Sequence, residues 1–124
     1  MHDVVHLTVP SSPRYAATVR YVAMNVTAIA GFDVDRVEDA RLAVDEAFNA
    51  LLSLQAPEIR CAIACTDAGF RAALRAAGTA DHLPGAQSFG WTVLRALVTT
   101  VDITQDGSDA CITLTMQHDP VTSP

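Results

Sequence analysis

The chain has 124 residues, half of them apolar, and a formal net charge of −6. This composition excludes a disordered segment, and the scattered basic residues argue against direct nucleic-acid binding. The length suits one domain, residues 1–124, that buries about two-thirds of its unfolded surface without disulfides or metals. No apolar run is long enough to span a bilayer, and the first residues, MHDVVHLTVP, do not resemble a signal peptide. We therefore expect a cytoplasmic protein that binds neither nucleic acid nor membrane.

The first half of the chain predicts a strand and two helices. Alternating apolar residues predict a strand over 4–9, with Val5, Leu7 and Val9 on one side. Ser12 and Pro13 then provide an N-cap and a first helical residue. The helix that follows runs to residue 30, and the apolar residues of its stripe are Tyr15, Val19, Val22, Val26 and Ile29.

The second helix is predicted over 37–54, with the sequence VEDARLAVDEAFNALLSL. Its core-facing stripe comprises Val37, Ala40, Val44, Ala47, Phe48 and Leu51. Glu46 and Asn49 lie outside this stripe and, three residues apart, point the same way. Such a pair either activates a water and holds a metal-bound phosphate, or forms an ordinary solvated face. The spacing alone does not decide between these two interpretations.

The second half predicts strands and one more helix. The segment 58–66 alternates as a strand, and Asp67-Ala68-Gly69 is a turn signal. The run FRAALRA at 70–76 consists of helix-forming residues, but its position after a tight turn favours the second arm of a hairpin. A loop, a helix over 88–98 with Trp91, Leu94 and Val98 on its stripe, and two strands over 101–104 and 110–116 follow, and the tail from Gln117 is expected to fray.

The predicted order is therefore β-α-α-β-β-α-β-β. One layer of helices and one layer of strands make an α/β two-layer sandwich, in which a mixed, largely antiparallel sheet is covered by helices on one face.

The three cysteines, Cys61, Cys65 and Cys111, are interpreted as small buried apolar residues. Cys61 and Cys65 on one strand lie roughly 13 Å apart, beyond disulfide reach. Thiol sensing is an alternative that requires a thiol of low pKa exposed to solvent. His2 and His6 are too few ligands to predict a metal site.

The element order resembles that of the RsbW-type anti-sigma factors, the small serine-kinase branch of the GHKL (Bergerat-fold) ATPases. The segments that carry the resemblance are AVDEAFN on the second helix and SFGWTVLRALVTTVDI before the final hairpin. The similarity runs from VPSSPRY through RLAVDEA to ITLTM, over nearly the whole chain.

The resemblance implies a nucleotide site that has lost several of its parts. Glu46 matches the general base, but the family's Mg²⁺ ligand falls on Ala50, and Asn49 is one place early, a shift of about 100° around the helix. The adenine-reading Asp-x-Gly falls on Ala76-Ala77-Gly78, and the phosphate-binding Gly-x-Gly falls on Ser88-Phe89-Gly90. Only 79–87 remains for the lid. The cofactor residues implied are thus Asn49, Gly78, Ser88 and Gly90, with the binding of ATP and Mg²⁺ weak or lost.

The function implied by the resemblance is that of an anti-sigma factor. Such a protein sequesters a sigma factor of RNA polymerase and is released by a STAS-domain anti-anti-sigma partner. The first helix and the nearby surface make the partner and homodimer contacts in similar proteins, which singles out Arg14 and Arg20. Two alternatives remain: an active serine kinase that phosphorylates its STAS antagonist with Glu46 as base, and a repurposed GHKL-like domain that binds another regulator.

Overall fold

The computed structural model describes residues 3–83 and 89–118. Three helices and five strands make up the described chain. In order, the elements are β1 (Asp3–Pro10), a 3₁₀ turn (Pro13–Tyr15), α1 (Ala16–Ile29), α2 (Val34–Leu52), β2 (Glu58–Thr66), β3 (Gly69–Ala77), a second 3₁₀ turn (Ala80–His82), α3 (Phe89–Leu97), β4 (Thr100–Asp106) and β5 (Asp109–Gln117). The predicted element order is confirmed.

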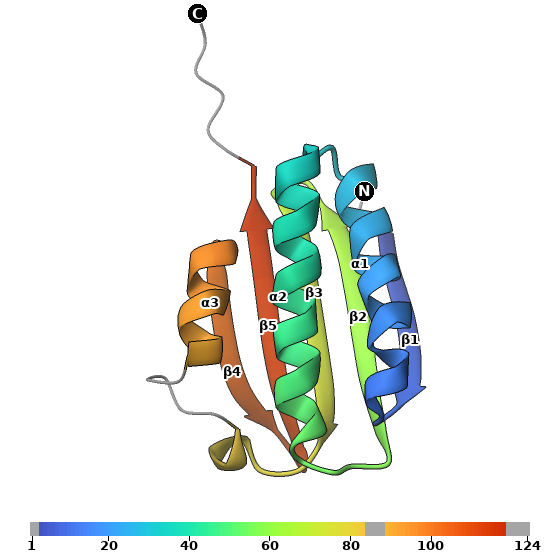
Figure 1. The fold of residues 1–124 in the computed structure, drawn as a ribbon, viewed down its shortest axis with the longest axis vertical. Coiled ribbons are helices and arrows are strands. Elements are labelled where there is room, and N and C mark those ends of the chain that lie inside the picture. The colour runs from blue at the N-terminus through green and yellow to red at the C-terminus, as the bar shows by residue number, and fades with distance from the viewer. Residues whose placement is uncertain (1–2, 84–88, 119–124) are drawn as a thin grey trace, which may run out of the picture.

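The five strands form one sheet in the order β1-β2-β3-β5-β4, and the helices lie on one of its faces (Figure 1). Every pair of neighbouring strands among the described residues is antiparallel. The two-layer α/β fold is therefore confirmed, but the expectation of mixed pairing is wrong. The helices α1 and α2 cross the sheet in opposite directions, so the chain enters β2 antiparallel to β1. The strands β3 and β4 run the same way, but β5 lies between them.

The helix α1 follows the turn that Ser12 caps by accepting a hydrogen bond from the backbone N–H of Arg14. Its buried residues are Val19, Ala23, Val26 and Thr27. The predicted stripe is wrong at its end, because Ile29 is 64% exposed. The true stripe is rotated toward the small residues Ala23 and Thr27, and the hydroxyl of Thr27 is satisfied by donating to the carbonyl of Ala23.

The helix α2 lies over the middle of the sheet (Figure 1). It begins three residues earlier than predicted, because the side chain of Asp33 accepts a hydrogen bond from the backbone N–H of Arg36 at 2.9 Å and caps it there. Its buried residues are Ala40, Ala43, Val44, Ala47, Phe48 and Leu51. Three of these are alanines, and β3 presents Ala72 and Ala76, also fully buried, on the covered face. Small side chains on both surfaces let the helix approach the sheet closely.

The strand prediction for the run FRAALRA is confirmed. Phe70, Ala72, Leu74 and Ala76 are all buried on the covered face of the sheet, as alternation requires. The last hairpin extends further than predicted, because pairing continues to Asp106 and Asp109 around a two-residue turn.

At the other end of the hairpin, β5 includes Gln117, and the ring of His118 stacks on Phe32 with 4.2 Å between centroids. Order therefore continues past the expected start of the frayed tail, whose residues 119–124 lie outside the described chain. None of the described helices combines the length and apolar character needed to cross a bilayer.

Candidate functional site

A pocket of about 300 Å³ lies between α2 and α3. The residues that line it are Glu46, Asn49, Ala50, Ser53, Gly90, Trp91 and Leu94. The fold therefore brings together three predicted site residues, Glu46, Asn49 and Gly90, from segments about forty positions apart in the chain. Ser88, a fourth, lies outside the described residues.

The polar groups of this pocket are few and stand above an apolar floor. Trp91 and Leu94 are buried and form the floor, as the stripe of α3 predicts. Glu46 is half-buried, and its carboxylate has no hydrogen bond or ion pair with another described residue. Asn49 is exposed, and the hydroxyl of Ser53 donates to the carbonyl of Ala50 at 2.5 Å. None of the described lining residues is basic.

Gly78, the remaining predicted site residue, is not among the described residues that line the pocket. It directly follows β3 and has a φ of +145°, and a Cβ there would lie 3.1 Å from Leu54 Cδ1. Leu54, which follows α2, packs directly on this glycine. Ala76, two residues earlier, is fully buried and carries only a methyl group.

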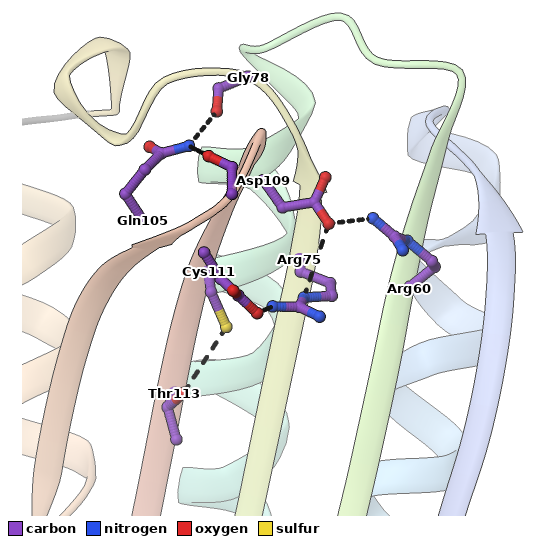
Figure 2. A network of polar contacts seen from close by, with 9 residues as sticks. Arg60, Arg75, Gly78, Gln105, Asp109, Cys111 and Thr113 are labelled. Carbon is purple, nitrogen blue, oxygen red and sulfur yellow. Dashed lines mark hydrogen bonds and ion pairs between the residues drawn. The ribbon is translucent and has the colours of Figure 1, made fainter.

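The loop after β3 is held by Gln105 on β4 (Figure 2). Its Oε1 accepts a hydrogen bond from the backbone N–H of Ala80 at 2.7 Å. Its Nε2 donates to the carbonyl oxygens of Gly78 at 3.0 Å and Gly107 at 3.1 Å. The described part of the predicted lid, 79–83, is thus a short turn fastened to the sheet. Sequence reasoning missed Gln105, because only the tertiary fold brings a strand glutamine to this loop.

The two arginines predicted as partner contacts differ in their surroundings. Arg14 is exposed in the turn before α1. Arg20 on α1 donates through Nε to Asp45 of α2 at 3.0 Å, and Arg41 approaches the same carboxylate at 3.7 Å. Asp45 therefore faces α1 and not the pocket. On the exposed side of α2, a hydrogen bond from Arg41 lowers the pKa of Glu38.

The cysteines are not equivalent. Cys61 and Cys111 are buried, but Cys65 is only partly buried, so the prediction of three buried thiols is wrong for Cys65. Cys65 pairs with Asp3, the first described residue of the edge strand β1. Burial raises the pKa of the Cys61 thiol to about 12, which opposes formation of the reactive thiolate.

The fold resembles that of a solved structure. That solved structure contains the RsbU and RsbW domains of Rv1364c from Mycobacterium tuberculosis. The two chains match with a TM-score of 0.68 and 20% sequence identity. The match covers 93% of this chain and 32% of the other, so this chain spans about a third of the length of that solved chain. No protein-family model matches the sequence, and no curated protein matches it. The chain thus has an RsbW-like α/β fold.

Proposed function

We propose that the protein is an anti-sigma factor that binds and sequesters a sigma factor of RNA polymerase, and that a STAS-domain partner displaces it. The observation that carries this proposal is the pair of alanines in an RsbW-like fold. Ala50 lines the pocket and Ala76 is fully buried. By the sequence resemblance, they correspond to the positions at which similar kinases hold Mg²⁺ and read adenine. A protein that keeps the fold but lacks these groups is better suited to binding another protein than to transferring phosphate.

Two features of the described residues argue against tight binding of a Mg²⁺–ATP complex and so support the proposal. A methyl group at Ala76 forfeits the charge-assisted hydrogen bond to the adenine amino group, about 1.5–3 kcal/mol. The described pocket lining also has no basic side chain to offset the phosphate charges. Since each 1.4 kcal/mol is tenfold in affinity, such losses together weaken nucleotide binding by orders of magnitude.

The outer surface of α1 and the start of α2 supply the partner-binding surface in this proposal. Tyr21 is 65% exposed, Ile29 is 64% exposed and Val34 is 84% exposed. Tyr21 and Ile29 are eight residues apart, so they lie on the same outward side of the helix. Exposed tyrosine and arginine are frequent anchors of protein interfaces, which keeps Arg14 among the proposed contacts. Arg20 on α1 already forms an ion pair with Asp45 of α2, so the role that the structure supports for it is to hold the two helices together.

The experiment that tests the proposal measures binding to the purified sigma factors of the source organism by titration calorimetry. We expect one sigma factor to bind, and Tyr21→Ala or Ile29→Ser to weaken it at least about tenfold, an interface anchor being worth about 1.4 kcal/mol or more. Ile103→Thr, at an exposed apolar residue on β4, is the matched control and should bind as the wild type does. If none of the sigma factors binds, the proposal fails.

A serine kinase is the second candidate, because Glu46, Asn49 and Gly90 line the same pocket. A titration with ATP and Mg²⁺, followed by transfer of labelled γ-phosphate to a STAS-domain protein, separates the two functions. The anti-sigma proposal predicts no binding at millimolar nucleotide. Binding and transfer that Glu46→Gln abolishes would establish the kinase instead. If a partner recovered from the native cytoplasm contains no sigma factor, a repurposed regulatory domain is the better description.

A further inference from the structure

A cavity of about 690 Å³ lies over the open face of the sheet, the face that no helix covers in the described part of the chain (Figure 1). Its volume is in the usual range of sites for small organic ligands. The cavity shares no described lining residue with the pocket between α2 and α3. It is therefore a second candidate site, and the proposed function does not use it.

The floor of this cavity contains two small apolar side chains. Ala62 on β2 and Ala73 on β3 are directly opposite each other in the strand register, and both line the cavity. Alanine is a poor strand former, and a solvated sheet face does not require it. The two methyl groups leave a low apolar area on which a flat apolar group can lie.

Arginines line the cavity on both sides of this floor. Arg71 and Arg75 flank the alanine of β3, and Arg60 is directly opposite Arg75 on β2. Arg60 and Arg75 both form ion pairs with Asp109, and Arg75 also binds Asp106 (Figure 2). Three guanidinium groups therefore face two carboxylates, and one positive charge is left uncompensated.

The uncompensated charge is that of Arg71. Its side chain is exposed and has no hydrogen bond or ion pair with any other described residue. The open face carries two further carboxylates, Glu58 on β2 and Asp102 on β4, but neither is among the described residues that line the cavity. The guanidinium of Arg71 is therefore available to an anion that enters the cavity.

On the other side of the floor, Arg60 has a donor without an acceptor. A terminal nitrogen of its guanidinium binds Asp109, but its Nε is buried and makes no hydrogen bond with a described residue. A buried donor that is left unpaired is unfavourable. Because the side chain is 42% exposed, its guanidinium has room to turn this N–H toward an acceptor in the cavity.

We propose that this cavity binds a small organic monoanion, a carboxylate with a flat apolar body. The carboxylate pairs with the planar guanidinium of Arg71, whose fork of N–H donors matches its two oxygens. The apolar body lies on the two alanines, and a neutral acceptor at the far end of the ligand takes the Nε–H of Arg60. A second negative charge at that end is unfavourable, because the two aspartates are already there. The inference does not depend on the proposed function.

An NMR titration of the ¹⁵N-labelled full chain tests the proposal. The probe is 4-acetamidobenzoate, which has a carboxylate at one end of a flat ring and a neutral carbonyl group at the other. We expect saturable shifts of the Arg71 Nε–H signal and of the backbone amides of Ala62 and Ala73. Terephthalate, with a second carboxylate in place of the neutral group, should bind about tenfold more weakly, and so should the uncharged methyl ester of the probe.

Arg71→Gln should weaken binding of the probe about tenfold, because it removes the unpaired charge. Ala73→Leu fills the floor without altering charge and should weaken binding as well. Arg14→Gln is the matched control, since it removes the same charge at an exposed arginine outside the open face, and it should leave the dissociation constant unchanged. Circular dichroism of each variant verifies folding. The proposal is overturned if these signals show no saturable shift up to tens of millimolar probe, if Arg71→Gln binds as the wild type does, or if terephthalate binds as tightly as the monoanion.

Discussion

At the scale of single residues, Gly69 joins three segments that are distant in sequence. It begins β3 with a φ of +145°, and a Cβ there would lie 2.2 Å from the carbonyl oxygen of Met116 and 3.0 Å from Phe32 Cζ. The missing side chain therefore lets β5 and the ring of Phe32 close onto the hairpin turn. Neither the backbone oxygen nor the packed ring is free to give way.

Gly69→Ala is accordingly predicted to destabilise the protein by at least ~3 kcal/mol, through backbone strain and a clash with main-chain atoms. Gly107→Ala is the matched comparison, because Gly107 also has a positive φ, +61°, but nothing lies within 4 Å of its added Cβ. It should cost only about 1 kcal/mol. Urea unfolding of both variants measures the difference, and equal costs would contradict the close packing at Gly69.

The raised pKa of Cys61 predicts a dependence of stability on pH. The thiol titrates at about 12 in the folded protein and near 9.0 when unfolded. Below pH 9 both states keep the proton, so the contribution is constant. Between the two values only the unfolded state loses it, and the free energy of unfolding should fall by about 1.4 kcal/mol per pH unit. Comparison of the wild type with Cys61→Ala isolates this slope. Parallel curves for the two proteins would show that the thiol is not buried in this way.

Residue-level errors in the sequence analysis have physical causes. The first helix was expected to bury Ile29, because large apolar side chains defined its stripe. In the fold, Ala23 and Thr27 take the inner positions. Their small side chains let α1 pack closely against the rest of the protein, which the pattern of large apolar residues did not indicate. The pairing of Arg20 with Asp45, and the contact of Gln105 with Gly78, depend on tertiary geometry that spacing along the chain does not contain.

At the scale of elements, helix caps and strand pairing decide where a helix or strand begins and ends. The periodicity of the apolar residues decides whether a segment is a helix or a strand. The run FRAALRA has the composition of a helix, yet its alternation places four apolar residues on the covered face of a strand. The position of this run after a tight turn was a better guide than its composition, and the sequence was sufficient to predict the strand. The sequence did not show that Asp33, and not Asp35, caps α2, because both are acceptable N-caps.

The connection after β3 owes its shape to one strand side chain, so it offers an element-level prediction. Gln105→Ala removes three hydrogen bonds, to Gly78, Ala80 and Gly107, and should cost about 1–2 kcal/mol, since the freed groups can rebind water. Amide exchange at Ala80 should accelerate markedly. Thr104→Ala, at an exposed neighbour on β4, should change neither stability nor exchange appreciably. If the Ala80 amide exchanges as slowly in Gln105→Ala as in the wild type, the turn is stable without the hydrogen bonds from Gln105.

At the scale of the whole molecule, the fold class was predictable because every element carried a clear period, while the candidate site was only partly predictable. Helical spacing placed Glu46 and Asn49 on one side of α2, and the pocket contains both. Gly78 was expected beside them, but Leu54 packs on it. The sequence pattern also did not determine whether neighbouring strands pair parallel or antiparallel. For β1 and β2, this depends on the directions in which α1 and α2 run between them.

The sheet order predicts a hierarchy of local stability. The strand β3 is paired on both sides and lies under α2, whereas β1 and β4 are paired on one side only. Native-state hydrogen exchange should therefore be slowest in β3, with the free energy of opening there approaching that of global unfolding. Amides of β1 and β4 should exchange through smaller local openings. Equal or greater protection in either edge strand would contradict this order.

The position of β5 also bears on how the protein is made. Of the five strands, β5 leaves the ribosome last, yet it lies between β3 and β4. Until it emerges, one edge of β3 has no partner, and the side chains of Phe70 and Leu74 lack part of their cover. An unpaired edge beside exposed apolar groups favours intermolecular pairing. A premature stop anywhere before residue 109 would therefore leave an aggregation-prone fragment for chaperones and proteases to remove, and not a smaller working domain.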